Sequence, residues 1–403
     1  MNSRATQGEM EERAALSDRL RRPPPPHDGA PAYYRAKHRQ DRGQQPMVAR
    51  ADYGMIRPGR SVPNRSAMNP TPDNTLADPE QKQAAVSLIR PALREYRTWG
   101  LDSSRWKGYE PRPDDIIVAT YPKCGTTWMQ QIVSSLIFQD ATSRPLLDIF
   151  PFIAGRHFGD PEAIYATING QKHRRSLKSH EPLDGIPFYD EIRYIHVARD
   201  GRDTAMSLHN QWINFNDQAR QRFDRIGLSD PAIGRPLPAI PTEPAETFRF
   251  WLSRSEIPDQ TDGAIGLSFF DFEVTYWAER KRSNLLLVNY CDLLADLDGE
   301  MRRVSAFLDI PVKEEVWPAL VKAAQFSEMR ASADEIMPHL NRSLSGGAQG
   351  FFHAGTNGRW RNVLTPEDLA AYDAKLRAKF SPALAAWIEG GRRAAGDPRL
   401  LPD

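Results

Sequence analysis

The 24 residues 115–138, DIIVATYPKCGTTWMQQIVSSLIF, constrain the fold more than any other stretch of the chain. They begin with a short apolar run, 116–119, which is typical of a parallel strand covered on both faces. Apolar side chains such as Trp128 and Ile132 then recur at helical spacing. The polar turn PKCGTTW joins the two patterns. The sequence therefore predicts a buried strand, a tight turn and a helix in immediate succession.

The turn brings together groups that bind an anion. Backbone N–H groups, the positive end of the helix dipole, Lys123 and the hydroxyls of Thr126 and Thr127 would meet at one point. Either threonine could also cap the helix. The spacing differs from a Walker A loop, GxxxxGK[ST], because Lys123 precedes Gly125. The alternative is an ordinary connection with an exposed lysine, and the complete strand, turn and helix favour an anion site.

The order of strand and helix recurs along the chain. Apolar runs open 192–212 and 284–308 and pass into helical spacing, and 175–183 contains another short strand. This alternation predicts an α/β fold, a single domain with a central parallel sheet flanked by helices. Ligands bind at the carboxyl ends of such strands. The candidate residues at or just after strand ends are Lys123, His180, Arg199 and Tyr290.

Composition limits the classes of partner. Lys plus Arg (53) nearly balance Asp plus Glu (52), so the chain lacks the basic signature of a nucleic-acid-binding protein. Its two cysteines, Cys124 and Cys291, do not have metal-binding spacing, and no metal site is predicted. Few cysteines fit a reduced, cytoplasmic protein. The sequence shows no signal-peptide core and no run of 18 apolar residues, so no membrane span is expected.

The domain organisation follows from the distribution of proline and aliphatic residues. Residues 1–75 are rich in Pro and Arg and poor in aliphatic clusters, so we expect a disordered extension. It is either dispensable or, less favoured, a basic docking arm. We expect the folded domain over 76–395 and a short tail over 396–403.

Two regions depart from the alternation. Residues 217–263 contain many prolines, and we interpret this long insertion as a substrate loop or lid. Near the start of the domain, residues 81–101 predict a helix interrupted at Pro91.

The loop YPKCGTTW resembles the 5′-phosphosulfate loop of the cytosolic-type sulfotransferases, which are aryl- and alcohol-sulfotransferase-like enzymes. Four further motifs match this family in order, and the resemblance spans about 99–390. It implies a P-loop-like sulfotransferase topology and an enzyme of the EC 2.8.2 type. Such an enzyme transfers the sulfuryl group of 3′-phosphoadenylylsulfate (PAPS) in line to a hydroxyl or amine, without a metal.

The resemblance implies roles for three residues at the chemistry. In the segment LKSHEP, His180 would take the acceptor proton as general base. Lys178 lies two positions earlier, on the same side of the strand, and would steady the sulfuryl oxygens. Lys123 would hold the 5′ phosphate and stabilise the leaving oxygen. A lone histidine is usually structural, and the position of His180 at a strand end favours catalysis.

The resemblance also implies a binding site for the nucleotide. Arg199 and Ser207 would hold the 3′-phosphate, because arginine gives planar, bidentate recognition. Trp128, Tyr290 and Phe326 would contact the nucleotide. The remaining donor-site residues are Cys124, Gly125, Thr126 and Thr127.

Two positions depart from the family pattern. Cys124 replaces the commoner Ser or Ala, and a thiol at a helix N-terminus can be acidified and so sensitive to oxidation. The final motif is close to RKGxxGxWKN in the family and is HAGTNGRWRN here. The Arg and Lys that grip the 3′-phosphate are thus His353 and Ala354. We predict weaker 3′-phosphate binding, partly offset by His353 and the amide of Gly355.

Two other functions stay open at this point. A P-loop nucleotide kinase-like phosphotransferase would need Mg²⁺ ligands and a lysine after the second glycine, and the sequence shows neither. A catalytically silent nucleotide-binding homologue is favoured by His353 and Ala354. The intact Lys123, Lys178 and His180 count against it.

The acceptor is expected to be a small molecule. The predicted walls, 150–170 and 217–263, and their neighbourhood carry aromatic residues, which favour a hydrophobic or aromatic acceptor, although a carbohydrate also fits aromatic walls. A homodimer is considered, but the carboxy-terminal dimer motif of the family is poorly matched after Arg361. The aromatic residues in question are Phe150, Phe152, Phe158 and Trp212.

Overall fold

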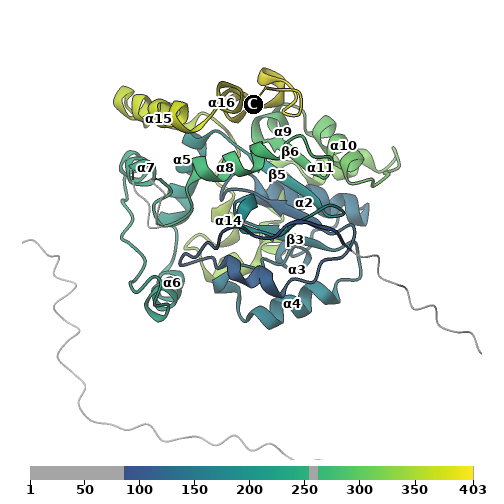
Figure 1. Cartoon of the computed structure of the whole chain (residues 1–403), viewed down its shortest axis with the longest axis horizontal. Coiled ribbons are helices and arrows are strands. Elements are labelled where there is room, and N and C mark those ends of the chain that lie inside the picture. Colours follow the sequence, from purple (N-terminus) through teal and green to yellow (C-terminus); the bar gives the residue numbers. More distant parts are fainter. Residues whose placement is uncertain (1–85, 254–261, 403) are drawn as a thin grey trace, which may run out of the picture. The chain divides into compact units, whose positions relative to one another are not determined.

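The computed structural model describes residues 86–253 and 262–402, which belong to one compact unit, Pro79–Asp403. A four-stranded, entirely parallel sheet lies at its centre, in the spatial order β3-β2-β5-β6 (Figure 1). The predicted α/β fold with a central parallel sheet flanked by helices is therefore confirmed. The strands are β2 (Ile116–Ala119), β3 (Ser176–Ser179), β5 (Arg193–Ala198) and β6 (Leu285–Asn289).

Helices and loops make the connections, because parallel strands can be joined only by a crossover. The α-helices are α2 (Thr126–Phe138), α3 (Leu146–Ile149), α4 (Pro161–Gly170), α5 (Gly201–Ile213), α6 (Asp217–Ser229), α7 (Pro244–Ser253), α8 (Phe269–Ala278), α9 (Tyr290–Ala295), α10 (Leu297–Phe307), α11 (Trp317–Ala323), α12 (Phe326–Ala331), α13 (Ala333–Ile336), α14 (Gly347–Phe351), α15 (Pro366–Lys379) and α16 (Pro382–Ala395). The 3₁₀ helices are η2 (Ser103–Gly108), η3 (Arg156–Phe158), η4 (Leu183–Gly185), η5 (Pro338–Arg342) and η6 (Arg359–Asn362).

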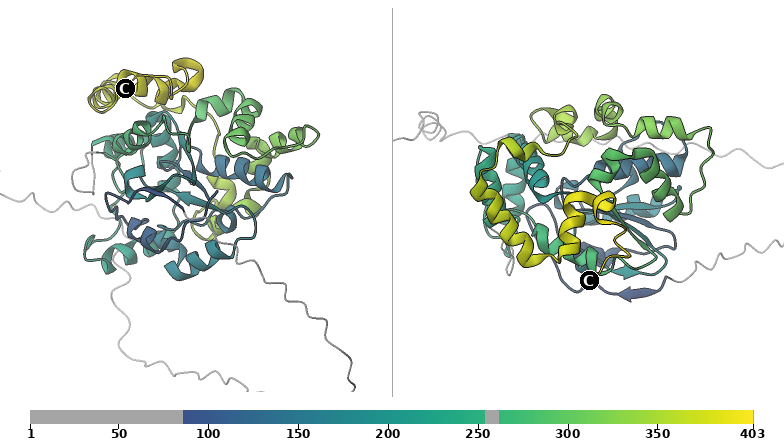
Figure 2. Two further views of the ribbon diagram at one scale, coloured as in Figure 1. Left: turned by 45° about the vertical axis from the view of Figure 1, so that its right-hand side comes forward. Right: turned by 90° about the horizontal axis from the view of Figure 1, so that it is seen from above.

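Side chains alternate along each strand and so enter two apolar clusters, one on each face of the sheet. Ile117, Leu177 and Leu285 belong to the cluster covered by α5, α7, α8, α15 and α16. Ile116 and Val118 belong to the other, which α2, α3, α10 and α11 cover. Figure 2 shows the yellow C-terminal helices, α15 and α16, together on one side. β2 is buried on both faces along its whole length, as the apolar run 116–119 predicts, and so is β6.

The two regions outside the alternation differ from expectation. A helix interrupted at Pro91 is wrong for the described part of 81–101, because Leu88–Arg90 form β1, which pairs antiparallel with β4 (Phe188–Tyr189). The insertion 217–263 contains the whole of α7, which confirms a helix expected from about Pro244 to Arg254, and it is less irregular than expected because it also contains α6. The side chain of Asn216 caps α6 by accepting from the N–H of Ala219.

The structure describes the predicted C-terminal tail but not the predicted N-terminal extension. The proposed extension, 1–75, lies outside the described residues, as do 254–261 of the insertion. The tail, 396–403, contacts the domain as far as it is described. Arg280 donates hydrogen bonds to the carbonyls of Pro398 and Leu401, both at 2.9 Å.

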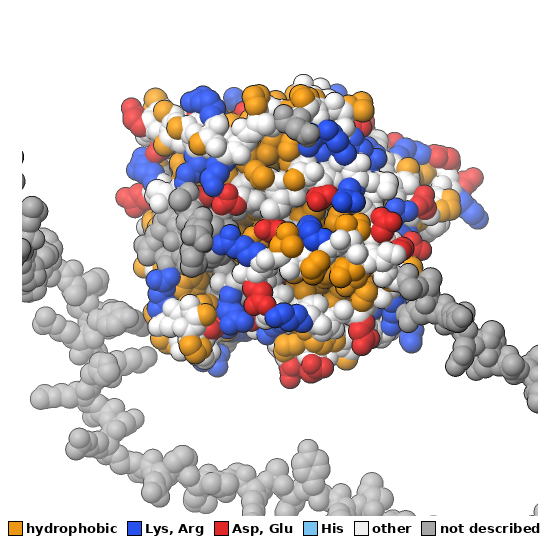
Figure 3. All heavy atoms as spheres, viewed as in Figure 1, with side chains coloured by type: hydrophobic (Ala, Val, Ile, Leu, Met, Phe, Trp, Pro, Cys, Tyr) orange, Lys and Arg blue, Asp and Glu red, His pale blue; other side chains and the backbone are white. Residues whose placement is uncertain are grey.

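Within the described ranges, no helix combines the length and the apolar character that crossing a bilayer requires. The face in Figure 3 mixes basic, acidic and apolar side chains.

Candidate functional site

A cavity of about 710 Å³ lies at the carboxyl ends of the parallel strands. Lys123 follows β2, His180 follows β3, Arg199 follows β5 and Tyr290 follows β6, and all four line the cavity. The structure thus brings together the predicted site residues, with the exception of the Cys124 side chain. The others that line it are Gly125, Thr126, Thr127, Trp128, Lys178, Ser207, Phe326, His353 and Gly355.

The turn between β2 and α2 has a left-handed backbone at two positions. Lys123 has φ 72° and Gly125 has φ 111°. A Cβ atom on Gly125 would lie 3.0 Å from the ring of Tyr290, so both the backbone angle and the space favour glycine. Gly125 is the N-cap of α2, and among the described residues no side chain forms a hydrogen bond that caps the start of this helix. The expected cap by Thr126 or Thr127 is therefore wrong, since the Thr126 hydroxyl lies 2.5 Å from that of Thr120 instead.

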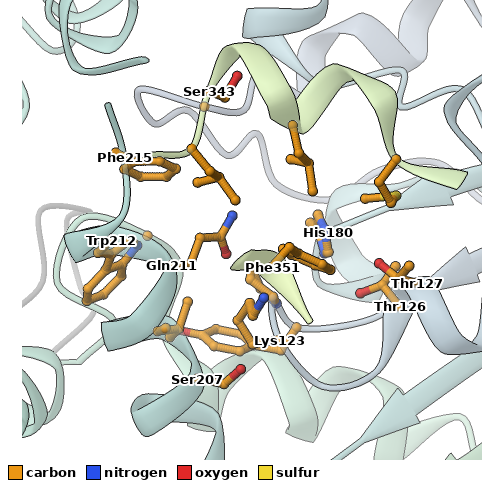
Figure 4. Close-up of a pocket in the computed structure, with 18 of the residues that line it drawn as sticks. Lys123, Thr126, Thr127, His180, Ser207, Gln211, Trp212, Phe215, Ser343 and Phe351 are labelled. Atoms are coloured by element: carbon orange, nitrogen blue, oxygen red, sulfur yellow. The ribbon is translucent and has the colours of Figure 1, made fainter. Parts of the chain in front are cut away.

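An uncapped helix start leaves N–H groups available for an anion. Lys123 and Lys178 both line this cavity. The Lys123 ammonium lies 3.7 Å from the ring centroid of Phe351, and that of Lys178 lies 5.2 Å from the ring centroid of Phe152. In Figure 4 the side chain of Lys123 points into the cavity and lies between Ser207 and His180.

The surroundings of Lys123 and Lys178 disfavour their protonated forms and so lower both pKa values. Burial, together with the charges of Arg199, Lys178 and Arg359, lowers the pKa of Lys123 to about 7. Burial lowers the pKa of Lys178 to about 8, although the negative charge of Glu181 acts to raise it. An anion in the cavity would relieve this crowding of like charges.

His180 has a fixed tautomer. Its Nδ1–H donates to the carbonyl of Thr120 at 2.8 Å, because a carbonyl can only accept. The ring also meets the edge of Phe152, with centroids 5.3 Å apart. Burial and the charges of Lys178 and Lys123 hold the pKa of His180 well below its usual value. The imidazole is therefore neutral, and its Nε2 has a free lone pair.

Arg199 ties the final glycine-containing loop to the anion-binding turn. It donates to the Asn357 side chain at 3.0 Å, to the Thr356 carbonyl at 2.8 Å and to the Lys123 carbonyl at 3.2 Å. Its guanidinium carbon lies 4.2 Å from the ring centroid of Tyr290. Arg199 thus holds the loop that contains Thr356 and Asn357 next to the turn that contains Lys123, at one side of the cavity.

Three aromatic rings form another wall of the cavity. The indole N–H of Trp128 donates to the Ala324 carbonyl at 2.7 Å, which fixes its ring edge-on to Tyr290 at 5.2 Å. Phe326 lies so close to Gly355 that a Cβ there would be 2.5 Å from its ring. The loop can approach Phe326 this closely only with glycine.

Cys124 faces away from the cavity. It is buried in the core, and its Sγ lies 3.4 Å from the Thr204 hydroxyl. Burial raises the pKa of the thiol. This is the opposite of the acidified thiol considered from the sequence, and it explains why a small residue fits here.

Aromatic and aliphatic side chains line much of the cavity. Phe152, Phe158 and Trp212 line it as expected, but Phe150 is buried in the core cluster beside α2 and α3. Sequence analysis missed the wall formed by 329–344, because those residues carry no motif. It also missed Arg359, although the quoted loop contains it. The missed wall residues are Met329, Met337, His339, Leu340, Arg342, Ser343 and Leu344.

Within the part of the chain that the structure describes, no three His, Cys, Asp or Glu side chains form a group that could hold a metal ion.

Comparison with known proteins identifies the family. The model of the sulfotransferase domain matches residues 113–382. A glycolipid sulfotransferase of Mycobacterium tuberculosis is 31% identical over 312 residues, which cover 74% of this chain and 94% of the relative. Sulfotransferase 1B1 of Mus musculus is 26% identical, over 70% of this chain and 88% of its own length.

A solved structure shows the same fold. Retinol dehydratase in complex with androsterone and inactive cofactor PAP is 19% identical, with a TM-score of 0.51, over 70% of this chain and 87% of that one. The sequence matches extend over most of the sheet and the cavity, and they do not favour the phosphotransferase alternative. The chain therefore belongs to the sulfotransferase family, as a PAPS-dependent sulfotransferase.

Proposed function

We propose that this sulfotransferase moves the sulfuryl group of PAPS in line to a hydroxyl, or an amine, of a small hydrophobic acceptor, with His180 as general base. One observation carries the proposal. A neutral imidazole with a fixed tautomer lies near two half-buried lysines, Lys123 and Lys178, at the ends of neighbouring strands, and neither lysine forms an ion pair with a carboxylate of the described residues.

The donor would bind across the turn and the loop. Its 5′-phosphosulfate would lie at the uncapped start of α2, held by Lys123 and the threonine hydroxyls. The adenine would lie among Trp128 and Phe326. The 3′-phosphate would bind beside Arg199 and Ser207, both of which line the cavity.

The proposed step balances as follows. The acceptor hydroxyl gives its proton to Nε2 of His180, and its oxygen forms the new bond to sulfur. The bond between sulfur and the bridging oxygen breaks, and its electron pair leaves with adenosine 3′,5′-bisphosphate (PAP). Lys123 and the α2 N–H groups would meet the charge that develops on this oxygen, while Lys178 would hold the sulfuryl oxygens. Since protein groups meet this charge, we propose that no metal takes part.

The acceptor would occupy the apolar end of the cavity. Phe158, Trp212 and Phe223 line this end, and Phe223 comes from α6 in the predicted substrate insertion. These walls favour a molecule with a large apolar part. The mycobacterial relative is, by its name, a glycolipid sulfotransferase. A phenol and a glycolipid should therefore be compared as acceptors.

The first test is thermal stabilisation of the purified protein by PAP and by ATP with Mg²⁺. A ligand at 100 times its dissociation constant stabilises the folded state by about 2.7 kcal/mol. Stabilisation by PAP, followed by sulfation of at least one acceptor with PAPS, is the expected result. Stabilisation by ATP with Mg²⁺ alone would contradict the donor assignment, and PAP binding without turnover would indicate a silent homologue.

We further propose a cytoplasmic location. Cys124 and Cys291 are both free thiols, and a Danio rerio relative that is 27% identical is named a cytosolic sulfotransferase. Fractionation of cells that express the protein tests this. Light scattering on the purified protein would distinguish a monomer from the homodimer that the sequence analysis considers.

A further inference from the structure

The final loop lacks two cations that its resemblance predicts. His353 and Ala354 stand where the family pattern has Arg and Lys. Burial, with the charges of Arg359 and Arg330, lowers the pKa of His353, so its imidazole is a weak replacement for a permanent charge. A phosphate bound here would need another cation.

Arg359 lies in the same loop and lines the cavity. Its backbone N–H donates to the Asp203 carboxylate at 3.1 Å, and the N–H of Gly358 donates to the other oxygen at 2.8 Å. Asp203 lies in the first turn of α5, the helix that follows Arg199 and carries Ser207. The backbone of Arg359 is thus fixed beside the two residues implied for the 3′-phosphate.

The guanidinium of Arg359 is not neutralised by an acid. Across the described residues, it forms no ion pair with a carboxylate, and both oxygens of nearby Asp203 already accept backbone N–H groups. Burial and the charge of Arg199 lower the pKa of Arg359, although the charge of nearby Asp203 acts to raise it, and the charge of Arg359 in turn lowers the pKa of Lys123. A negatively charged group of a ligand would therefore bind favourably next to the Arg359 guanidinium.

We propose that Arg359 binds the 3′-phosphate of the donor nucleotide, together with Arg199, and takes over from the cations missing at 353 and 354. This inference rests on the donor site proposed above. It replaces the expectation of weak 3′-phosphate binding with one of ordinary strength supplied from a different position in the loop.

The position of Asp203, which holds the backbone of Arg359, indicates which phosphate of the donor Arg359 would bind. The 5′ end of the donor is assigned to the start of α2, whereas Asp203 holds Arg359 at the start of α5. The loop is also tied to Arg199 through Asn357 and Thr356. Arg359 therefore belongs to the 3′ side of the site.

The test compares two ligands by calorimetry on the full-length protein. PAP carries the 3′-phosphate, and adenosine 5′-phosphosulfate lacks it. We expect Arg359→Ala to weaken PAP binding by about ten- to a hundredfold, as for a lost charged hydrogen bond, and to leave the other ligand nearly unchanged. Arg361→Ala is the matched control, since Arg361 is exposed and lies over Trp360 outside the cavity.

A second variant guards against a merely structural effect. Adding Ala354→Lys to Arg359→Ala should restore part of the lost PAP affinity, because the cation returns at the position where the family has it. Equal losses for both ligands, or unchanged PAP affinity, would overturn the role of Arg359 while leaving the donor site intact. If the unaltered protein bound no PAP at all, the proposed donor site itself would fail, and this inference with it.

Discussion

Lys123 and Lys178 show how single residues prepare the cavity for an anion. Each is half-buried beside an aromatic ring, and their pKa values of about 7 and 8 lie below the ordinary lysine value of 10.5. Near neutral pH the empty site holds them only partly charged. A bound phosphosulfate would restore their full charge, so nucleotide binding should be coupled to proton uptake.

This coupling predicts the pH dependence of binding. Between pH 7 and 9 the empty site loses protons from Lys123 and Lys178, and PAP affinity should fall as the pH rises. Calorimetry in two buffers of different ionisation enthalpy measures the protons taken up per PAP bound. Proton release, or an affinity that is flat across this range, would contradict the assignment of these lysines to the donor.

His180 gives a sharper prediction at the same scale. His180→Ala should lower kcat by about 10²–10⁴-fold, which is the usual contribution of a positioned general base. PAP affinity should stay within about twofold, because the imidazole is assigned to the acceptor proton and not to the phosphates. Steady-state rates and calorimetry together separate the two effects. A variant that kept its rate would rule out His180 as the base.

At the scale of elements, the turn into α2 depends on a conformation that only glycine adopts freely. Gly125→Ala would place a left-handed alanine against the Tyr290 ring. We expect a loss of about 1–2 kcal/mol in unfolding free energy from the backbone and weaker PAP binding from the displaced ring. Denaturant unfolding and calorimetry measure these two quantities.

Gly159→Ala is the control for this variant. Gly159 has nearly the same φ, 112°, but a Cβ there would contact nothing within 4 Å. Its ψ of −159° lies outside the left-handed region that Gly125 occupies with ψ 19°, so Gly159→Ala should lose at least as much stability, and it should keep PAP affinity. If both variants bound PAP equally well, the contact between Gly125 and Tyr290 would have no role in the donor site.

Elements with strong local signals were predictable from the sequence, and those set by distant partners were not. The strand 116–119 and the helix that follows it, α2, are predicted by short-range patterns and match the structure, although the predicted threonine cap of α2 does not. Leu88–Arg90 became a strand because β4, about a hundred residues away, pairs with it. Phe150 and Phe152 are alike in sequence, yet only packing decides that Phe152 faces the cavity.

At the scale of the whole molecule, strand order explains why motifs far apart in the sequence meet. β2 lies between β3 and β5, so the turn that carries Lys123 is adjacent to both His180 and Arg199. The motif order alone indicates these residues, but not their distances. The wall formed by 329–344 was unpredictable for the same reason, since its position depends on how α12, α13 and η5 fold over the sheet.

The compact unit Pro79–Asp403 contains every residue that lines the cavity, from Thr98 to Arg359. We therefore predict that a protein beginning at residue 79 keeps its melting temperature within about 2 °C and its PAP affinity within about twofold. Calorimetry on both forms tests this. A marked loss of either quantity would show that residues 1–78 belong to the working enzyme. Unchanged PAP binding with lost retention on an anionic resin would instead favour the basic docking arm over a dispensable extension.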